Sequence, residues 1–328
     1  MKIQIAALLA LLGAPLAPVS AAKEMNAVSY TGMCDASGAA ALNSHFFAVA
    51  DDESNWIRIY HREQGGPPVQ CLDLTGFLRA DLKNPETDIE GAARIGDVIY
   101  WISSHSRSRS GRERENRHRF FATRIVEAAG APRLEPFGEP YAGLLDDLIK
   151  APELRKYNLK AASKLAPKEG GGLNIEGLCA TPEKTLLIGF RSPVPKGLAL
   201  LVPILNPEAV ALGKKARLGA PIELDLGGMG IRDITFEKGR YSIIGGGQGS
   251  GRDFEIFVWD GRSPKAEPRK ELDRHHFHAE AIFYYPDSPR FAQVLSDDGS
   301  RQNEGLDCKN LPESSRSFRK IEVHLRGK

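Results

Sequence analysis

The sequence predicts an all-β protein, a β-propeller of five blades that is closed by pairing of the N- and C-terminal strands. Three observations predict this fold. A short motif recurs five times, most copies are about fifty residues apart, and each unit divides into short β-rich segments between turn residues. Periods of about 40 to 50 residues are usual for the four-stranded sheets of propellers.

The recurring motif is an acidic or small polar residue that opens an extended apolar segment, followed by a turn and a second apolar strand. Its copies begin at Asp35, Asp88, Asn174, Ile231 and His278. The starts are separated by 53, 86, 57 and 47 residues. The second interval is much longer than the others, so an insertion is expected there.

The insertion is expected over residues 142–165. Leu144, Leu145, Leu148 and Ile149 recur there at helix-like intervals among charged residues. We therefore predict that this segment is helical. The alternative is a propeller of six blades, with a degenerate blade hidden in the insertion.

The strands of each unit follow from β-branched and aromatic runs between turn residues. In the first two units they are expected at 37–42, 45–52, 56–63, 69–75, 90–95, 97–105, 117–126 and 133–141. The third and fourth units span Ile175 to Leu226 and Arg232 to Leu272. The fifth unit has only three strands, at 278–285, 291–297 and 318–325. Its open edge would be free to pair with other chains, and a strand over Asn26 to Gly32 can fill it.

The N-terminus has the features of a secretory signal peptide over residues 1–22. Lys2 precedes an apolar run over residues 3–12, and small residues follow before the next charges. A glycine and two prolines break this run well short of the roughly 20 apolar residues of a membrane span. We expect residues 23–328 to form a single periplasmic or secreted domain without a membrane span. An uncleaved anchor is the alternative.

Charge and cysteine content limit the partners and the cross-links. The formal net charge of +2 gives no general attraction to nucleic acid or anionic membranes, so we expect neither as a partner, and we expect a monomer. Ring closure brings Cys34, after the first strand, toward Cys308, before the last one. A disulfide between them is therefore predicted. Cys71 and Cys179 lie in different blades and are expected to stay free.

The start of each innermost strand is expected to place a polar side chain at one mouth of the central channel. Glu90, Glu176, Asp233 and Glu280 hold this position in four units, and Ser37 holds it in the first. Crowded carboxylates repel one another unless a cation, an arginine or a proton intervenes. Their oxygen atoms suit Ca²⁺ or Mg²⁺ as ligands. In the alternative interpretation each acid is structural, capping its own turn or accepting N–H bonds between blades.

Further polar residues are expected at the same face, where each second strand ends. His105, Arg191 and Gln248 belong to this group. His278 and Glu280 are two residues apart on one strand, so they point to the same face and form a candidate pair of metal ligands. The alternative is that this pair is structural.

A run of basic residues lies between the second and third strands of the second unit. Arg107, Arg109 and Arg112 begin it. Guanidinium groups bind phosphate and other anions, so the run predicts a small anionic or phosphorylated substrate. A solvated, mobile loop is the alternative. The run lacks interleaved aromatic residues, which disfavours single-stranded nucleic acid.

Three motifs carry a resemblance to a known family: Asp88-Ile-Glu90-Gly91-Ala92, Asn174-Ile-Glu176-Gly177-Leu178 and Gly189-Phe190-Arg191-Ser192-Pro193. They resemble those of domain-of-unknown-function family 3616, an exported bacterial propeller family, over nearly all of the mature chain. That family also looks similar to the esterase-like phytases. The similarity implies a phosphoester substrate. The first unit departs from the motif, because Ser37 stands where others have an acid.

Two functions fit these patterns. In the first, the protein is a metal-assisted phosphoesterase: Glu90, Glu176, Asp233 and Glu280 hold a divalent ion that activates water, and Arg191, Gln248 and the basic loop bind the phosphate. His105 is a further candidate catalytic residue. In the second, it is a non-catalytic exported propeller that binds a protein, a glycan or an anion. The fold alone does not decide between them.

Overall fold

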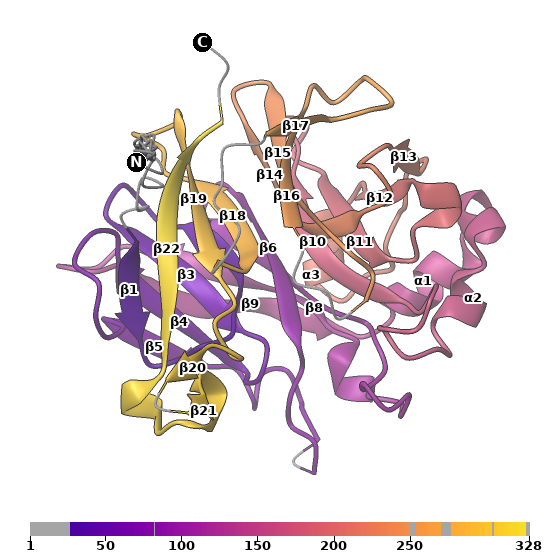
Figure 1. Cartoon of the computed structure of the whole chain (residues 1–328). Coiled ribbons are helices and arrows are strands. Elements are labelled where there is room, and N and C mark those ends of the chain that lie inside the picture. Colours follow the sequence, from indigo (N-terminus) through magenta and orange to yellow (C-terminus); the bar gives the residue numbers. More distant parts are fainter. Residues whose placement is uncertain (1–26, 82, 250–253, 270–276, 304, 326–328) are drawn as a thin grey trace, which may run out of the picture.

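Five four-stranded antiparallel sheets surround a central channel in the computed structural model, which describes residues 27–81, 83–249, 254–269, 277–303 and 305–325 (Figure 1). Each sheet is one blade, and the innermost strands of neighbouring blades lie side by side around the channel. The five-bladed fold is therefore confirmed. The predicted signal peptide lies outside the described residues.

Four blades are each built from one continuous stretch of chain. Blade I contains β2 (Ala36–Ala41), β3 (Phe46–Asp51), β4 (Trp56–His61) and β5 (Gln70–Asp73). Blade II contains β6 (Ile89–Ile95), β7 (Val98–Ser103), β8 (Phe120–Val126) and β9 (Arg133–Tyr141). Blade III contains β10 (Asn174–Ala180), β11 (Leu186–Ser192), β12 (Ala199–Ile204) and β13 (Ile222–Leu224). Blade IV contains β14 (Gly230–Glu237), β15 (Arg240–Gly246), β16 (Phe254–Trp259) and β17 (Glu267–Arg269).

Blade V joins the two ends of the chain. Its strands are β18 (Ala279–Tyr284), β19 (Phe291–Ser296), β22 (Ser317–His324) and β1 (Val28–Thr31). Figure 1 shows the N-terminal strand β1 beside the C-terminal strand β22. They pair antiparallel, with Val28 opposite Lys320 and Thr31 opposite Ser317. The predicted closure by the two terminal strands is confirmed.

The segment between blades II and III is helical. It contains α1 (Leu144–Lys150), the 3₁₀ helix η2 (Pro152–Tyr157) and α2 (Leu159–Ala162). Leu144, Leu148 and Leu159 are buried against the apolar side chains of blades II and III. The six-bladed alternative is therefore wrong, because the leucine spacing serves helices that cover the blades and adds no strands.

The remaining elements are short connections. They are η1 (Glu115–Arg117), η3 (Pro195–Gly197), α3 (Pro207–Ala211), β20 (Gln302–Asn303), β21 (Leu306–Asp307), η4 (Cys308–Asn310) and η5 (Glu313–Ser315). In the part of the chain that the structure describes, no helix has the length and apolarity needed to cross a bilayer.

Packing between blades explains the apolar composition of the second strands. Every residue of β7 is buried, including Trp101, because both faces of this strand are covered by neighbouring blades. The indole of Trp101 donates to Thr123 Oγ1 at 2.9 Å, so its polar atom is also satisfied. The innermost strand β2 carries small residues, including three consecutive alanines, where the blades converge.

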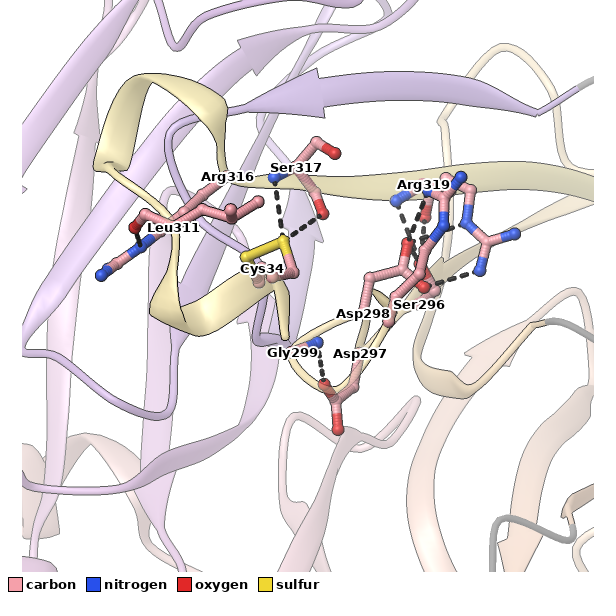
Figure 2. The surroundings of a disulfide bond; sticks show 11 residues. Cys34, Ser296, Asp297, Asp298, Gly299, Leu311, Arg316, Ser317 and Arg319 are labelled. Atoms are coloured by element: carbon pink, nitrogen blue, oxygen red, sulfur yellow. Dashed lines mark hydrogen bonds and ion pairs between the residues drawn. A yellow bond between two sulfur atoms is a disulfide. The ribbon is translucent and has the colours of Figure 1, made fainter. Parts of the chain in front are cut away.

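A disulfide joins Cys34 to Cys308, with a Cα–Cα distance of 6.0 Å, as expected from ring closure (Figure 2). It connects the segment after β1 to the excursion between β19 and β22. Cys71 and Cys179 are free. Beside the disulfide, Arg319 Nη2 contacts Asp298 Oδ1 at 2.6 Å, which holds the start of that excursion against β22.

Candidate functional site

In blades II to V a bulge at the start of the innermost strand directs one side chain toward the channel mouth, whereas the predicted residue of blade I, Ser37, is buried, donates to Ile89 O and does not line the mouth. In blade II, Ile89 pairs with Ser103 and Gly91 pairs with Ile102, so Glu90 is the extra residue. The same shift makes Glu176 the extra residue of blade III and Glu280 that of blade V. Bulges re-aim side chains in this way at functional sites.

In blade IV the position of Asp233 differs from the prediction. There Ile231 pairs with Gly245 and Asp233 pairs with Ile244, so the extra residue is Arg232. Arg232 therefore takes the place that the sequence prediction gave to Asp233. Asp233 is the next residue, at the position after the bulge that Gly91 and Gly177 hold in blades II and III.

Asp233 does not line the channel mouth. Its side chain is buried, and Oδ1 accepts the N–H of Ile234 at 2.8 Å while Oδ2 accepts the N–H of Ile282 at 2.7 Å. Ile282 belongs to blade V, so this carboxylate links blades IV and V. Burial raises the pKa of Asp233 well above its usual value, against the effect of these N–H donors.

A polar cavity of about 550 Å³ occupies the channel mouth. Its acidic lining residues are Asp52, Glu53, Glu86, Asp88, Glu90, Glu176, Glu280 and Asp297. Its basic lining residues are Arg109, Arg117, Lys168, Arg191, Arg232 and Lys309. The predicted residues Gln248 and His278 also line it. Both signs of charge therefore meet in one cavity of the size of a small-molecule site.

Three of the carboxylates are close enough to share one cation. One oxygen of each of Glu90, Glu176 and Glu280 lies within 4.8 Å of the others. Oxygen atoms bound to one Ca²⁺ at about 2.4 Å are separated by at most about twice that distance, so the spacing fits. Asp52, Asp88 and Glu90 form a second group that meets the same limit. Glu90 belongs to both groups.

Arginines neutralise part of this charge but leave one oxygen without a partner. Arg191 Nη1 contacts Glu176 Oε1 at 2.7 Å, and Asn174 Nδ2 donates to the same oxygen at 2.8 Å. Arg232 forms an ion pair with Glu280. Glu176 is 2% exposed, and its second oxygen, Oε2, is buried without a hydrogen-bond partner among the described residues. A buried carboxylate oxygen in this state is suited to a cation.

Burial and crowding favour protonation of several of these acids. Burial raises the pKa of Glu280 to about 7, with Arg232 opposing and Glu176 adding to the rise. Burial likewise raises the pKa of Asp88 to about 7, although Arg117 lowers it. Burial and repulsion from Asp88 and Glu176 raise the pKa of Glu90 well above its usual value. A cation could replace the protons that these groups otherwise retain.

Cations gather on the blade III and IV side of the cavity. Burial, followed by repulsion from Arg109, Arg191 and Arg232, lowers the pKa of Lys168. Arg191 is held in place by carbonyl oxygens of the glycine-rich loop, with Nε donating to Gly247 O at 3.1 Å. This side of the cavity is therefore suited to an anion.

His105 lies away from the cavity. It follows β7 with a φ of 53°, which turns its ring into the protein, where it is 1% exposed. Its Nδ1 is 2.7 Å from Ser103 O, and the ring stacks on His118 at 5.8 Å. Burial and then His118 lower its pKa to about 3. His105 is thus neutral at ordinary pH, and it does not line the cavity.

The basic loop is divided between two surfaces. Arg109 lines the channel mouth, whereas Arg107 and Arg112 do not. Arg107 is turned toward the helical insertion, because its Nε donates to Ser163 O at 3.0 Å. Arg112 is exposed, and its N–H donates to Ser108 Oγ.

Sequence reasoning missed several residues of the cavity. Arg232 is preceded by an isoleucine, as Glu90 and Glu176 are, and this alignment could have identified it. Lys168 follows the helical insertion and Lys309 lies in the disulfide-linked excursion, where no repeat motif marks them. Only the tertiary fold brings these two lysines to the channel mouth.

Comparison with solved structures finds distant propellers. An exo-β-1,3-galactanase from Phanerochaete chrysosporium has 10% identity and a TM-score of 0.49, covering 92% of this chain and 64% of its own. The PQQ-bound aldose sugar dehydrogenase from Streptomyces coelicolor has 13% identity and a TM-score of 0.42, covering 91% and 99%. A luciferin-regenerating enzyme has 7% identity and a TM-score of 0.44, covering 92% and 96%. These likenesses are too distant to carry a functional argument.

Sequence comparison identifies the family but not a characterised relative. No curated protein matches the chain. The similarity to esterase-like phytases stays a prediction. The family described as Protein of unknown function (DUF3616) matches residues 35–132 and 139–287, which is most of the chain. The chain therefore belongs to the DUF3616 family.

Proposed function

We propose that the protein is a phosphoesterase that uses a divalent cation, Ca²⁺ or Mg²⁺, bound by Glu90, Glu176 and Glu280. One observation carries the proposal: an oxygen of each carboxylate lies within 4.8 Å of the others, and Glu176 Oε2 is buried without a partner. Carboxylate oxygens are the ligands that these cations prefer.

The surrounding side chains have distinct parts in this proposal. When bound, the cation would lower the pKa of a water molecule and polarise a phosphoryl oxygen. Arg191 orients Glu176, while Arg109 and Lys168 would contact the phosphate oxygens. Asp88, with its pKa raised to about 7, is suited to transfer a proton near neutral pH.

The experiment begins with protein freed of metal by a chelator. Calorimetry should detect binding of Ca²⁺, Mg²⁺ or Mn²⁺, and a panel of phosphomonoesters and phosphodiesters should be hydrolysed only when the cation is present. Glu176→Gln should weaken cation binding roughly tenfold or more, because it removes a charged ligand. Arg191→Ala should reduce hydrolysis. Glu267→Gln, an exposed change on β17, is the matched control.

A non-catalytic binding propeller is the second candidate. It is favoured by the ion pairs of Arg191 with Glu176 and of Arg232 with Glu280, which neutralise two of the three carboxylates without a cation. Absence of turnover on the whole panel with every metal, together with wild-type behaviour of Glu176→Gln and Arg191→Ala, would favour this candidate over the phosphoesterase.

A further inference from the structure

A second polar cavity lies between the loop after β7 and the helical insertion. Its volume is about 700 Å³. The cationic side chains that line it are Arg79, Arg107, Arg114, Arg119, Lys160 and Lys164. They outnumber the four carboxylates that also line it, Asp81, Glu113, Glu115 and Asp146. The cavity is therefore positively charged on balance, and none of the residues of the cation site contributes to it.

Backbone carbonyl groups fix the guanidinium of Arg119 in this cavity. Its nitrogens donate to Leu78 O at 2.9 Å, to Glu115 O at 2.9 Å and to His118 O at 3.0 Å. Within the described parts of the chain, no carboxylate forms an ion pair with it. Carbonyl oxygens orient a guanidinium but do not neutralise its positive charge. The side chain of Arg119 is therefore held in place while its charge is not neutralised by an ion pair.

Arg107 is fixed in the same manner on the other side of the loop. Its Nε donates to Ser163 O at 3.0 Å and its Nη1 to Gly111 O at 3.1 Å. The carboxylate of Glu113 is 3.8 Å away and 64% exposed, so water screens that pair. Arg107 thus connects the loop to the insertion while its charge stays available.

Charges of both signs act on the groups of this cavity. Burial lowers the pKa of Arg119, Glu115 opposes this change, and Arg79 adds a smaller lowering. Burial, then Arg119, lowers the pKa of His118. An anion in the cavity would relieve this repulsion.

Part of the cavity wall is apolar. Ala142, Leu145 and Ile149 line it from the helical insertion. A ligand that satisfies both the cationic and the apolar side chains must carry an anionic group and a carbon body. We propose that this cavity binds an organic phosphate or sulfate monoester, with the oxyanion at Arg107 and Arg119 and the carbon chain against Leu145 and Ile149. This site is independent of the proposed phosphoesterase centre.

The test is calorimetry on the full chain with chelator present, using inorganic phosphate, butyl phosphate and butyl sulfate as probes. Both butyl esters should bind more tightly than inorganic phosphate, because their chains contact the apolar wall. Arg119→Gln should weaken butyl phosphate binding roughly tenfold or more. Lys164→Glu, at an exposed position of the rim, gives a second measurement if Arg119→Gln does not fold.

Two controls separate this site from the channel mouth. Arg290→Glu reverses an exposed charge in the turn between β18 and β19 and should leave binding unchanged. Arg191→Ala alters the channel mouth and should also leave it unchanged. The proposal is overturned if no probe binds, if Arg119→Gln and Lys164→Glu bind as the wild type does, or if Arg191→Ala abolishes binding.

A vesicle experiment distinguishes a lipid headgroup from a soluble ester as the source of the anion. If anionic phospholipid vesicles sediment with the protein and Lys164→Glu prevents this, the ligand group is a lipid phosphate. If butyl phosphate binds while vesicles do not, the ligand is a soluble ester.

Discussion

At the level of single residues, the buried acids at the channel mouth and in the blades beside it differ in which groups compensate their charge. Asp233 accepts two backbone N–H groups, and Glu176 is paired with Arg191 through only one of its oxygens. Asp35 has neither kind of partner among the described residues: it is 9% exposed and lies beside Asp51 and Asp297. These environments lead to different responses to pH and to substitution.

Asp35→Asn should stabilise the metal-free protein more as the pH rises. Burial, then repulsion from Asp297 and Asp51, raises the pKa of Asp35 to about 8. Between its unfolded pKa and this value the folded state retains a proton that the unfolded state loses, so wild-type stability falls as the pH increases. Asparagine cannot lose that proton. The advantage of the variant should grow by at most about 1.4 kcal/mol per pH unit.

Urea unfolding at about pH 5 and about pH 8, with chelator present, measures this difference, because the two values lie between the unfolded-state and folded-state pKa of Asp35. A difference between Asp35→Asn and wild type that stays constant across the range would contradict the assigned environment of Asp35. Added Ca²⁺ is omitted, because a cation bound near Asp35 would stabilise the charged form of its carboxylate.

Asp233→Ala should destabilise the fold by about 2 kcal/mol or more. The change leaves the N–H groups of Ile234 and Ile282 buried without an acceptor, and an unsatisfied buried donor costs about 1–3 kcal/mol. Chemical denaturation measures the loss. Cation affinity should be retained in the folded variant, because Asp233 does not line the cavity. Loss of cation binding with unchanged stability would reverse this assignment.

Three of the five residues predicted at the strand starts, Glu90, Glu176 and Glu280, do line the channel mouth, and blade IV shows why the sequence could not identify the others. An acid precedes a small residue in Glu90-Gly91, Glu176-Gly177 and Glu280-Ala281. By analogy the sequence predicts that an acid, Asp233, faces the channel in blade IV. The bulge there presents Arg232 instead, because backbone register, and not residue type, decides which side chain faces the channel. His105 was misplaced for a related reason: its positive φ turns the chain after β7.

At the level of elements, the bulges and the glycines beside them act together. The residue after the bulge faces the neighbouring blade, and at Gly91 an added Cβ would lie 2.7 Å from Glu176 O. At Gly38 it would lie 2.6 Å from the backbone carbon of Gly91. Only a residue without a side chain lets these innermost strands approach closely enough to bring the carboxylates together.

Gly91→Ala should therefore destabilise the protein by roughly 1–3 kcal/mol and weaken cation binding, because the backbone of Glu176 must move. Gly170→Ala is the matched control, since an added Cβ there meets nothing within 4 Å. Thermal unfolding and calorimetry measure the two effects. Equal behaviour of the two variants would show that the inner strands are not closely packed at this point.

The regular elements were more accessible to sequence reasoning than the connections. The fully buried β7 and the leucine-spaced helix α1 carry strong apolar patterns, and both lie inside their predicted ranges, 97–105 and 142–165. The loop after β7 was expected to be either a clamp at the channel mouth or a mobile loop. Arg109 does line the channel mouth, but Arg107 and Arg119 are fixed by backbone carbonyls in the second cavity, an arrangement that no local sequence pattern specifies.

At the level of the whole molecule, β1 and the disulfide close the ring at the same blade. Residues Cys34 and Cys308 are 274 positions apart, so their bond constrains nearly all of the described chain. The excursion held by this bond also places Lys309 at the cavity, where its Nζ contacts Glu53 Oε1 at 3.1 Å. Ring closure and the composition of the site are therefore connected.

Replacing both Cys34 and Cys308 by serine should lower the free energy of unfolding by about 2–5 kcal/mol, since a long loop loses its cross-link in the unfolded state. Cys71→Ser, an exposed free cysteine, is the control and should change stability by no more than about 0.5 kcal/mol. Chemical denaturation without reductant gives both values. An equal, small effect for the two variants would contradict a structural role for the disulfide.

The pairing of β1 with β22 also sets the order of events during biosynthesis. The ribosome releases β1 first and β22 last, so the first strand waits for nearly the whole of translation before its partner exists. Until then blade V is incomplete and the ring stays open. If residues 1–22 are the export leader that the sequence predicts, this delay would be an advantage, because a nascent chain that has not closed its ring can still be threaded across a membrane.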